Sequence, residues 1–551
     1  MIGILVNSSQ RASAAEFFEL FKTPWEFLSE GREYSVVIDA TGGTPHSASR
    51  FSLVLGSDVG PFDRKHGLKA RSKCASESIV FGGQRIPIYR GLVEFPGGAD
   101  SFLRATSTGV SVLHVVKAED STIVRVGFGL FEEIEFLLSG NQPPGDAQIP
   151  VIELHIAILR HLIARAGLPL VEVPPVPAGH PFIACLTHDI DHPLIRNHAF
   201  DHTMFGFLYR ATAGSLKAWA TGRITLRDLA RNWTAAAVLP LVHLGLTRDI
   251  WSEFDRYLEL EAGCGGTYFA IPKRDDPGRN GEGYASRLRA SRYEISEILP
   301  QLKRILQAGS EVGLHGVDAW RDRESGEAEM KVLRGVVGDK EVGIRMHWLF
   351  FDENSPRILD EAGFTYDSSL GYCETVGFRA GTLQAYRPLA ARHLLELPLV
   401  VMDTALFYPA YLNLDEAGAK DLVWRLIDHA SRLGGALTIN WHDRSIFPER
   451  LWDGFYIRLL DELKRRGAWM PTASDAVGWF RKRRSAVVRM VRQSASEIQL
   501  SVSLPRHDNL PGLRVRIHRP SREGDWVSDP AGDENFREVT LNETEEISIS
   551  I

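Results

Sequence analysis

The hydrophobic pattern of the chain changes at a proline-rich segment. Before it, strand-like runs such as Tyr34–Ile38 and Gly109–Val116 are followed by Ile152–Ala166, where apolar residues recur at helical spacing. The segment Val171–Pro181 contains four prolines in eleven residues, so it cannot lie inside a helix or a central strand. The pattern predicts an N-terminal α/β domain over residues 1–175 that ends in a linker.

After the linker, apolar runs alternate with helical patterns. The runs that predict buried strands are Pro181–Asp191, Gly265–Pro272, Ser310–His315, Val342–His347, Leu394–Val400 and Ala436–His442. Helical patterns lie between several of them, at Glu294–Gln307, Ser355–Ala362 and Leu414–Leu433. This alternation predicts a parallel sheet or barrel, in which functional groups gather at the carboxyl ends of the strands. We assign residues 176–485 to this domain.

Two further regions have a different pattern. Residues 198–250 are rich in aromatic and apolar positions and predict a helical insertion. After the basic run Arg481–Arg492, strand-like alternation predicts a small β-rich module over residues 495–551. The basic run is typical of the solvated end of a helix, and a peripheral contact with anionic lipid is the alternative.

Composition narrows the class of protein. The chain has 551 residues, 44% hydrophobic residues and a net charge of −7, which disfavours a nucleic-acid partner. The four cysteines lack CxxC spacing, which argues against a zinc ribbon. No apolar stretch is long enough to predict a spanning helix, and the N-terminus lacks the pattern of a signal peptide. The composition leaves the oligomeric state open and predicts a cytoplasmic protein.

The segment Thr187–His192 places two carboxylates and two imidazoles at the end of a predicted strand. Side chains in a strand alternate between faces, so Asp189 and Asp191 point to the same side. Two carboxylates at one place repel each other unless a cation, a shared proton or hydrogen-bond donors compensate. The segment predicts a metal or proton-transfer site, with a polar turn that caps a helix as the alternative.

Other predicted strands end in side chains of the same kind. His315 lies three residues before Asp318, and Arg345 shares a strand face with His347. His442 follows the last buried strand, where an imidazole that titrates near neutral pH suits proton transfer. Their position predicts one shared site.

Two charged residues in loops are further candidates. Asp367 in YDSSLGY and Arg379 in GFRAGT are typical of groups that orient or stabilise a charged substrate. Loop hydrogen bonding and a surface ion pair explain them equally well.

The order of these motifs resembles the polysaccharide deacetylase domain (NodB homology, carbohydrate esterase family 4) over about residues 182–480. The resemblance implies a distorted (β/α) barrel of about seven strands with a divalent metal at the strand ends. It implies that Asp189 is the general base, Asp191 and His315 are metal ligands, Arg345 steadies the base and His442 is the general acid. The N-terminal part, with GLFEEIEFLL, is similar to the accessory domain of some bacterial deacetylases associated with exopolysaccharide or capsule synthesis.

One position departs from the family. The family motif HxxxH supplies two imidazoles, but Ala319 stands four residues after His315. We expect His347 to provide the third ligand, with Asp318 as runner-up. Imidazole and carboxylate ligands favour zinc, with cobalt as an alternative. The expected reaction is removal of an acetyl group from an amino sugar or polysaccharide, such as an exopolysaccharide, a capsule or a cell-wall glycan.

Aromatic residues near the motifs are candidates for the sugar-binding surface. Pyranose faces stack on aromatic rings, and core packing is the alternative for each ring: Trp320, Trp348, Tyr372 and Trp441. Two other functions stay open at this point. A glycoside hydrolase would use Asp189 with a second carboxylate, and Ala319 raises the hypothesis of a glycan-binding module without catalysis.

Overall fold

The computed structural model describes residues 1–43, 49–73, 77–98, 100–117, 121–251, 254–280, 283–493, 497–504, 509–521, 524–528, 535–541 and 545–550. The chain forms two compact units. The N-terminal unit contains Met1–Gly179, Phe378–Leu389 and Gly478–Ile551, and the barrel unit contains His180–Gly377 and Ala390–Val477. The first boundary lies close to the linker that the prolines predict.

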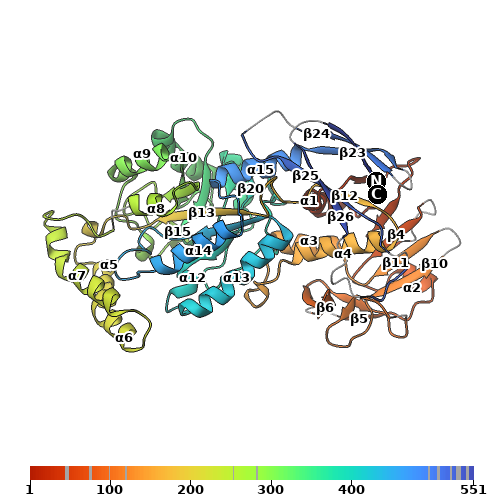
Figure 1. Ribbon diagram of the computed structural model, residues 1–551, viewed down its shortest axis with the longest axis horizontal. Helices are drawn as coiled ribbons and strands as arrows, with labels where there is room; N and C mark the ends of the chain where they lie inside the picture. The colour runs from red at the N-terminus through yellow and green to blue at the C-terminus, as the bar shows by residue number, and fades with distance from the viewer. Residues whose placement is uncertain are drawn as a thin grey trace. The chain divides into compact units, whose positions relative to one another are not determined.

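The N-terminal unit is built on a six-stranded sheet (Figure 1). Its order is β10 (Leu113–Lys117), β11 (Thr122–Val126), β4 (Phe51–Leu55), β3 (Val36–Asp39), β1 (Ile2–Leu5) and β2 (Trp25–Phe27). Only the β10–β11 pair is antiparallel. The unit also contains α1 (Arg11–Phe21), α2 (Pro61–Lys65), α3 (Leu130–Ser139) and α4 (Val151–Arg165). The rings of Phe17, Phe18 and Phe131 pack between α1 and α3.

Shorter ladders complete this unit. Two of them join β5 (Arg71–Lys73) to β8 (Leu92–Glu94), and β6 (Glu77–Phe81) to β7 (Gln84–Ile88) and β9 (Arg104–Ala105). The other two contain strands of the C-terminal segment. One joins β12 (Leu170–Glu172) to β25 (Leu513–His518) and β26 (Phe536–Leu541), and the other consists of β23 (Val487–Gln493), β24 (Glu497–Ser503) and β27 (Glu545–Ser550).

The C-terminal segment therefore belongs to the N-terminal unit, whereas the sequence predicted a module of its own. Strand β25 pairs with β12, and Glu172 on β12 lies 3.0 Å from His518 Nε2 on β25. Residues 378–389 join the same unit, where Thr382 Oγ1 donates to Glu153 Oε1 at 2.5 Å. Periodicity identifies a strand but not the strand with which it pairs, and this pairing is set by segments far apart in the chain.

The basic run Arg481–Arg492 differs from the expectation of a solvated helix end. The helix α15 (Ala473–Ser485) ends inside it, and β23 begins at Val487. Arg483 is buried and donates to Val173 O at 2.9 Å and Leu20 O at 2.8 Å. Arg484 donates to both carboxylate oxygens of Glu16. Arg483 and Arg484 therefore form hydrogen bonds and an ion pair within the protein.

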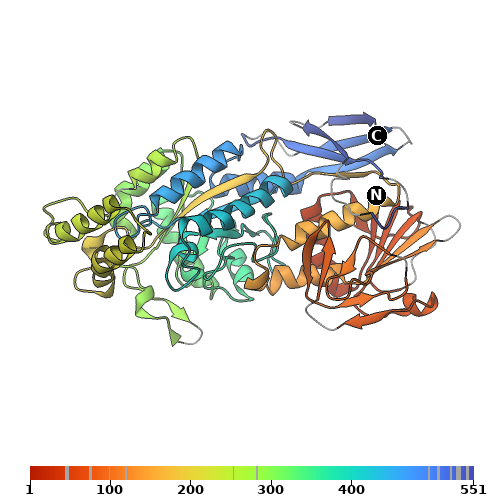
Figure 2. The same ribbon diagram turned by 60° about the horizontal axis from the view of Figure 1, so that its bottom comes forward.

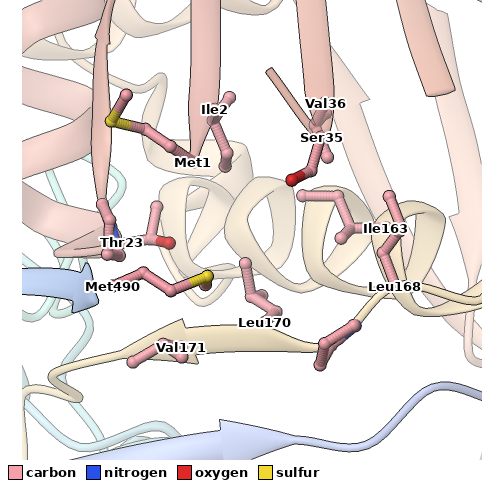
Figure 3. Close-up of a pocket in the computed structure, with 12 residues that line it drawn as sticks. Met1, Ile2, Thr23, Ser35, Val36, Ile163, Leu168, Leu170, Val171 and Met490 are labelled. Atoms are coloured by element: carbon pink, nitrogen blue, oxygen red, sulfur yellow. The ribbon is translucent and has the colours of Figure 1, made fainter. Parts of the chain in front are cut away.

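A small cavity lies in the N-terminal unit (Figure 3). Its volume is about 30 Å³, and Ile2, Val36, Ile163, Leu170 and Met490 line much of it. No acidic, basic, histidine or cysteine side chain lines it, so it offers packing space and no catalytic chemistry.

The barrel unit is built on an eight-stranded sheet in which every pair is parallel. Its order is β20 (Leu395–Glu396), β19 (Tyr366–Asp367), β18 (Gly343–Met346), β17 (Glu311–Gly316), β14 (Gly266–Ala270), β13 (Ile183–Ile190), β22 (Ala436–Asn440) and β21 (Leu399–Met402). Strands β20 and β21 lie at opposite edges, although only Leu397 and Pro398 separate them. The sheet must therefore curl round into a barrel that is open between them.

This architecture confirms the expected α/β class and parallel barrel, with one strand more than expected. The run Leu394–Val400, predicted as one strand, forms β20 and β21. Pro398 lies between the two strands and has no backbone N–H to donate to a ladder, which separates them.

Helices cover the sheet of the barrel unit (Figures 1 and 2). They are α8 (Asp255–Leu260), α9 (Leu299–Gln307), α10 (Arg323–Val337), α11 (Ser355–Ala362), α12 (Asp403–Phe407), α13 (Glu416–Leu433), α14 (Asp453–Arg465) and the start of α15. Helix α13 shows why they form: Asp415 caps its N-terminus, and Ala419, Val423 and Ala430 recur on one buried face. A short hairpin joins β15 (Arg279–Asn280) and β16 (Gly283–Tyr284).

The helical insertion lies where the sequence predicts it. It consists of α5 (His202–Tyr209), a π-helical turn (Arg210–Gly214), α6 (Ser215–Ala220) and α7 (Leu226–His243). Among the residues that the structure describes, none of the helices has both the length and the apolar character needed to cross a bilayer.

We expect Glu172→Gln to destabilise the N-terminal unit. The substitution removes the negative charge of buried Glu172 from the partly buried Arg160 and Arg516, and breaking a buried ion pair costs about 3–5 kcal/mol. Asp100→Asn is the matched control, since Asp100 and Arg104 form an exposed pair worth about 1 kcal/mol or less. Urea unfolding at neutral pH measures both free energies of unfolding, and equal losses would contradict the role of Glu172.

The loss should depend on pH. Burial alone raises the pKa of Glu172, but Arg160, His518 and Arg516 outweigh it and hold the pKa well below its usual range. The stabilisation is therefore present above the unfolded-state pKa of about 4.3 and is lost as the pH falls below it. The difference between wild type and Glu172→Gln should shrink progressively as the pH is lowered from about 4.

Candidate metal centre and active site

The residues that the motifs single out meet at the carboxyl ends of four strands of the parallel sheet. Asp189 lies near the end of β13 and Asp191 follows it, while His315, Arg345 and His442 lie at or just after the ends of β17, β18 and β22. His347 follows β18. The parallel direction of the strands brings these side chains to one end of the barrel.

Asp191, His315 and His347 form a compact triad. Asp191 Oδ1 lies 3.3 Å from His315 Nε2 and 3.3 Å from His347 Nδ1, and these two nitrogens are 3.0 Å apart. The other nitrogen of each ring faces a backbone carbonyl: His315 Nδ1 lies 3.0 Å from Arg345 O, and His347 Nε2 lies 2.9 Å from Arg289 O. A carbonyl only accepts, so these outer nitrogens carry the ring protons. The inner nitrogens therefore face Asp191 with free lone pairs.

This donor set fits a divalent cation. Burial is the largest effect on the pKa of His347 and lowers it, which favours the neutral ring that binds metals. Asp191 Oδ1 is buried and accepts no hydrogen bond from the described residues. Two nitrogen lone pairs and a carboxylate oxygen that converge without a proton between them repel one another, and a metal ion removes that repulsion. Among the residues that the structure describes, these three form the one group of histidine, cysteine and acidic side chains with metal-ligand spacing.

Asp318, the runner-up ligand, points elsewhere. Its Oδ1 accepts from Arg279 N at 2.8 Å, and its backbone N donates to Glu329 Oε1 at 2.7 Å. His347 Nδ1 instead lies 3.3 Å from Asp191 Oδ1 and 3.0 Å from His315 Nε2. This geometry favours His347 as the third ligand.

Asp189 is held as a buried carboxylate by two donors. Arg345 Nη1 donates to Asp189 Oδ1 at 3.1 Å, and Asn440 Nδ2 donates to Asp189 Oδ2 at 2.8 Å. Burial alone raises the pKa of Asp189, but Arg345, His315 and His442 outweigh it and the pKa is lowered. The carboxylate is therefore ionised and oriented, as a proton acceptor must be.

Arg345 is itself held by residues of β13 and by the residue that follows β19. Its Nη1 donates to Thr187 Oγ1 at 2.7 Å, Nη2 to Ser368 Oγ at 2.9 Å, and Nε to Ser368 O at 2.9 Å. The guanidinium also lies over the ring of Phe269, 4.6 Å from its centroid. These contacts define the position of the charge beside Asp189.

His442 is a buried histidine with a strong carboxylate partner. Its Nδ1 lies 2.6 Å from Asp403 Oδ1, and its backbone N donates to Asp403 Oδ2 at 2.7 Å. Burial alone lowers the pKa of His442, but Asp403, Asp191 and Asp189 outweigh it and raise the pKa to about 9. The ring is therefore protonated near neutral pH, and its Nε2, which lies 3.8 Å from Asp191 Oδ2, is positioned to donate a proton into the site. Asp443 faces the other way and accepts from His192 N.

Of the four candidate aromatic residues, Trp348 alone is exposed. Its side chain is 46% exposed, and its backbone has a φ of 59°, a left-handed value that is uncommon outside glycine. Trp320 and Tyr372 are buried, and Trp441 is fully buried against Tyr456 at 5.0 Å. This placement favours core packing for the three buried rings and leaves Trp348, next to His347, open to a ligand.

Asp367 and Arg379 do not join the site directly. Asp367 is fully buried, its Oδ1 accepts from Ser369 N at 3.0 Å, and burial raises its pKa to about 6. It orders the segment whose Ser368 holds Arg345. Arg379 belongs to the N-terminal unit, where its carbonyl accepts from Gln142 N at 2.7 Å.

Two residues of the site escaped the sequence analysis. Asn440 holds Asp189, and Asp403 holds His442. Asp403 directly follows the apolar strand Leu399–Met402, so the rule that identified the other strand-end residues applies to it as well. Asn440 lies within a quoted strand, but no pattern shows which way its amide points.

The comparisons with known proteins add the following. No protein-family model and no curated protein matches the sequence. Among solved structures, the chain is similar to a protein assigned as a polysaccharide deacetylase from Mycobacterium smegmatis, with 19% identity and a TM-score of 0.35 over 58% of this chain and 99% of that chain. It is similar to an allantoinase, with 16% identity and a TM-score of 0.33 over 56% of this chain and 92% of that chain. The chain is also similar to a protein assigned as a polysaccharide deacetylase from Pseudomonas aeruginosa PAO1, with 18% identity and a TM-score of 0.29 over 45% of this chain and 77% of that chain.

The triad predicts the metal stoichiometry and its dependence on His347. Metal-stripped protein should bind about one zinc or cobalt ion per chain, and His347→Ala should weaken binding more than about tenfold because one ligand is lost. Asp318→Asn is the matched control and should bind as wild type does. Calorimetry with zinc and the visible spectrum of the cobalt form measure this. A loss in Asp318→Asn equal to that in His347→Ala would contradict the assignment.

Proposed function

We propose that the barrel unit is a metal-dependent carbohydrate deacetylase. The observation that carries the proposal is the convergence of Asp191, His315 and His347 beside an ionised Asp189 and a protonated His442. A site that joins a metal-ligand triad, a base and an acid is suited to hydrolysis of an acyl group. The sequence motifs independently resemble those of the polysaccharide deacetylases.

Asp191, His315 and His347 would hold the metal, and zinc suits two imidazoles and a carboxylate. A divalent metal supplies Lewis-acid polarisation of the acetyl carbonyl and lowers the pKa of water. Asp189 takes a proton from the attacking water at its carboxylate. Arg345 and Asn440 keep that carboxylate oriented, since each holds one of its oxygens.

His442 supplies the proton that the leaving group needs. Its Nε2 faces the triad while Asp403 engages Nδ1, so the proton on Nε2 is directed into the site. An amine leaving group must be protonated as the C–N bond breaks, because the amide anion is too basic to depart. This chemistry favours an N-acetyl sugar as substrate, with an O-acetyl sugar as the second candidate.

The substrate class that we propose is an acetylated amino sugar in a glycan, such as an exopolysaccharide, a capsule or a cell-wall polymer. Trp348 offers an exposed ring next to His347, against which a pyranose face can lie. The accessory-domain resemblance of the N-terminal part supports a role in polysaccharide metabolism.

The two alternatives have less support. A glycoside hydrolase needs a second carboxylate beside Asp189 that is free to act on a glycosidic bond, but Asp191 faces two imidazoles. The hypothesis of a glycan-binding module without catalysis was motivated by Ala319, and His347 offers the nitrogen that Ala319 lacks.

Acetate release tests the proposal directly. The metal-restored protein should release acetate from acetylated chitooligosaccharides or bacterial glycans, and Asp189→Asn should lower kcat by about 10²–10⁴-fold because the general base is lost. Metal removal should abolish release, and added zinc should restore it. Asp318→Asn, with the same change outside the triad, should keep wild-type activity. Release by Asp189→Asn at the wild-type rate would overturn the assignment of the base.

A second variant tests the positioning of the acid. Asp403→Asn removes the charge that holds His442 protonated, so we expect kcat to fall about 10–100-fold while KM stays close to the wild-type value. Initial rates over a range of substrate concentrations separate the two constants. An increase in KM at unchanged kcat would show that Asp403 serves substrate binding instead.

A further inference from the structure

The helical insertion exposes an unusual amount of apolar surface. In the part of the chain that the structure describes, ten of the seventeen large apolar side chains classed as exposed lie between residues 200 and 246. They are Phe200, Phe205, Tyr209, Leu216, Trp219, Leu226, Trp233, Leu241, Leu244 and Leu246. Scattered single apolar residues are normal on a surface, but a concentration of this kind marks a binding surface.

These side chains form stripes along the helices. Helix α7 buries Leu229, Asn232, Ala235, Leu239 and Val242 on one face. A second stripe faces outward at Leu226, Trp233, Leu241 and Leu244, positions separated by seven, eight and three residues, which fall on one side of a helix. Leu244 is 70% exposed and Trp233 is 49% exposed. Helix α7 is therefore apolar on two faces, and only one of them is used for folding.

The segment α5–α6 repeats this arrangement. Phe205, Tyr209, Leu216 and Trp219 are exposed at intervals of four, seven and three residues across the π-helical turn. Figures 1 and 2 show α5, α6 and α7 side by side. Trp233 Nε1 of α7 donates a hydrogen bond to Thr212 O of the π-helical turn at 3.4 Å, and this contact links α7 to the segment that contains α5 and α6. We call residues 202–246 the helical hairpin.

The charge around these stripes is basic. From His202 to Arg248 the sequence contains six arginine or lysine residues and one aspartate, whereas the whole chain has a net charge of −7. Lys217, Arg223, Arg227 and Arg231 are exposed. Arg227 and Arg231 follow Leu226 by one and five residues and lie beside the exposed stripe of α7. Exposed aromatic and leucine side chains with flanking basic residues are typical of helices that lie in a membrane interface.

We propose that the helical hairpin docks the protein on the surface of an anionic phospholipid bilayer. The outward leucine and phenylalanine side chains enter the boundary of the acyl chains, while Trp219, Trp233 and Tyr209 lie at the level of the headgroups. Lys217, Arg223, Arg227 and Arg231 attract the negative headgroups. In this arrangement the hairpin lies in the plane of the membrane interface. This inference is independent of the proposed deacetylase activity.

The charge pattern favours lipid over a second copy of the chain. A symmetric dimer through the hairpin would place the same basic side chains near one another, and like charges across an interface oppose association. An anionic bilayer presents the opposite charge over the whole hairpin. It also accepts apolar side chains without requiring a surface of matching shape.

Vesicle flotation with the full-length protein tests the proposal. We expect binding to vesicles of phosphatidylglycerol and phosphatidylcholine in equal parts, more than about tenfold weaker binding to phosphatidylcholine alone, and loss of binding as NaCl rises from about 0.05 M to about 0.5 M. Trp219→Ser with Leu244→Ser should reduce binding to both vesicles. Lys217→Glu with Arg227→Glu should remove the preference for the anionic vesicles.

Tyr284→Ser with Leu288→Ser is the matched control, because both side chains are exposed in the barrel unit outside the hairpin. It should bind vesicles as wild type does, and circular dichroism should show the same fold for all variants. Brominated lipids should quench wild-type tryptophan fluorescence, and Trp219→Phe with Trp233→Phe should remove most of the quenching. The proposal is overturned if wild type does not bind anionic vesicles or if the hairpin variants bind like the control. It is also overturned if wild type is a dimer that the hairpin variants dissociate and vesicle binding is absent.

Discussion

The barrel unit depends on the buried ion pair between Arg345 and Asp189. Arg345 has no exposed surface, so its charge must be matched inside the protein. The guanidinium reaches Thr187 and Asp189 on β13 and Ser368 after β19, and it thereby links β18 to strands on both sides. Removal of Arg345 would leave a buried carboxylate without its counter-charge. The ion pair between Arg345 and Asp189 therefore also fixes the position of the proposed base.

The rest of the site extends this arrangement by shared contacts. The carbonyl of Arg345 engages His315 Nδ1, so the residue that holds Asp189 also orients a proposed metal ligand. Arg289 orients His347 through its own carbonyl. On the opposite side, Asp403 keeps His442 charged. Each of these groups is positioned by a partner inside the protein. One end of the barrel can therefore hold an ionised base, a protonated acid and a set of metal-binding lone pairs, and the acid does not pass its proton to the base.

Basic residues serve opposite purposes in two parts of the chain. In the run Arg481–Arg492, Arg483 and Arg484 are used inside the N-terminal unit, where they join α15 to the strands and helices around Glu16 and Val173. In the helical hairpin, Lys217 and Arg227 face solvent beside apolar stripes that no described residue covers. A cluster of positive charge in the sequence therefore does not identify a surface by itself. The difference lies in whether buried carboxylates and carbonyls are near enough to compensate the charge.

The sequence was enough to predict the parallel barrel and to propose the helical insertion and most of the candidate site, because strand periodicity and strand-end chemistry are local properties of the chain. The motifs at Asp189, Asp191, His315, Arg345 and His442 lie at strand ends, and a parallel sheet brings such ends together. The tertiary structure was needed to favour His347 over Asp318, to add Asn440 and Asp403, and to place Trp441 in the core. It also paired the C-terminal strand β25 with β12. These outcomes depend on side-chain direction and on distances between segments far apart in the chain, and the hydrophobic pattern specifies neither.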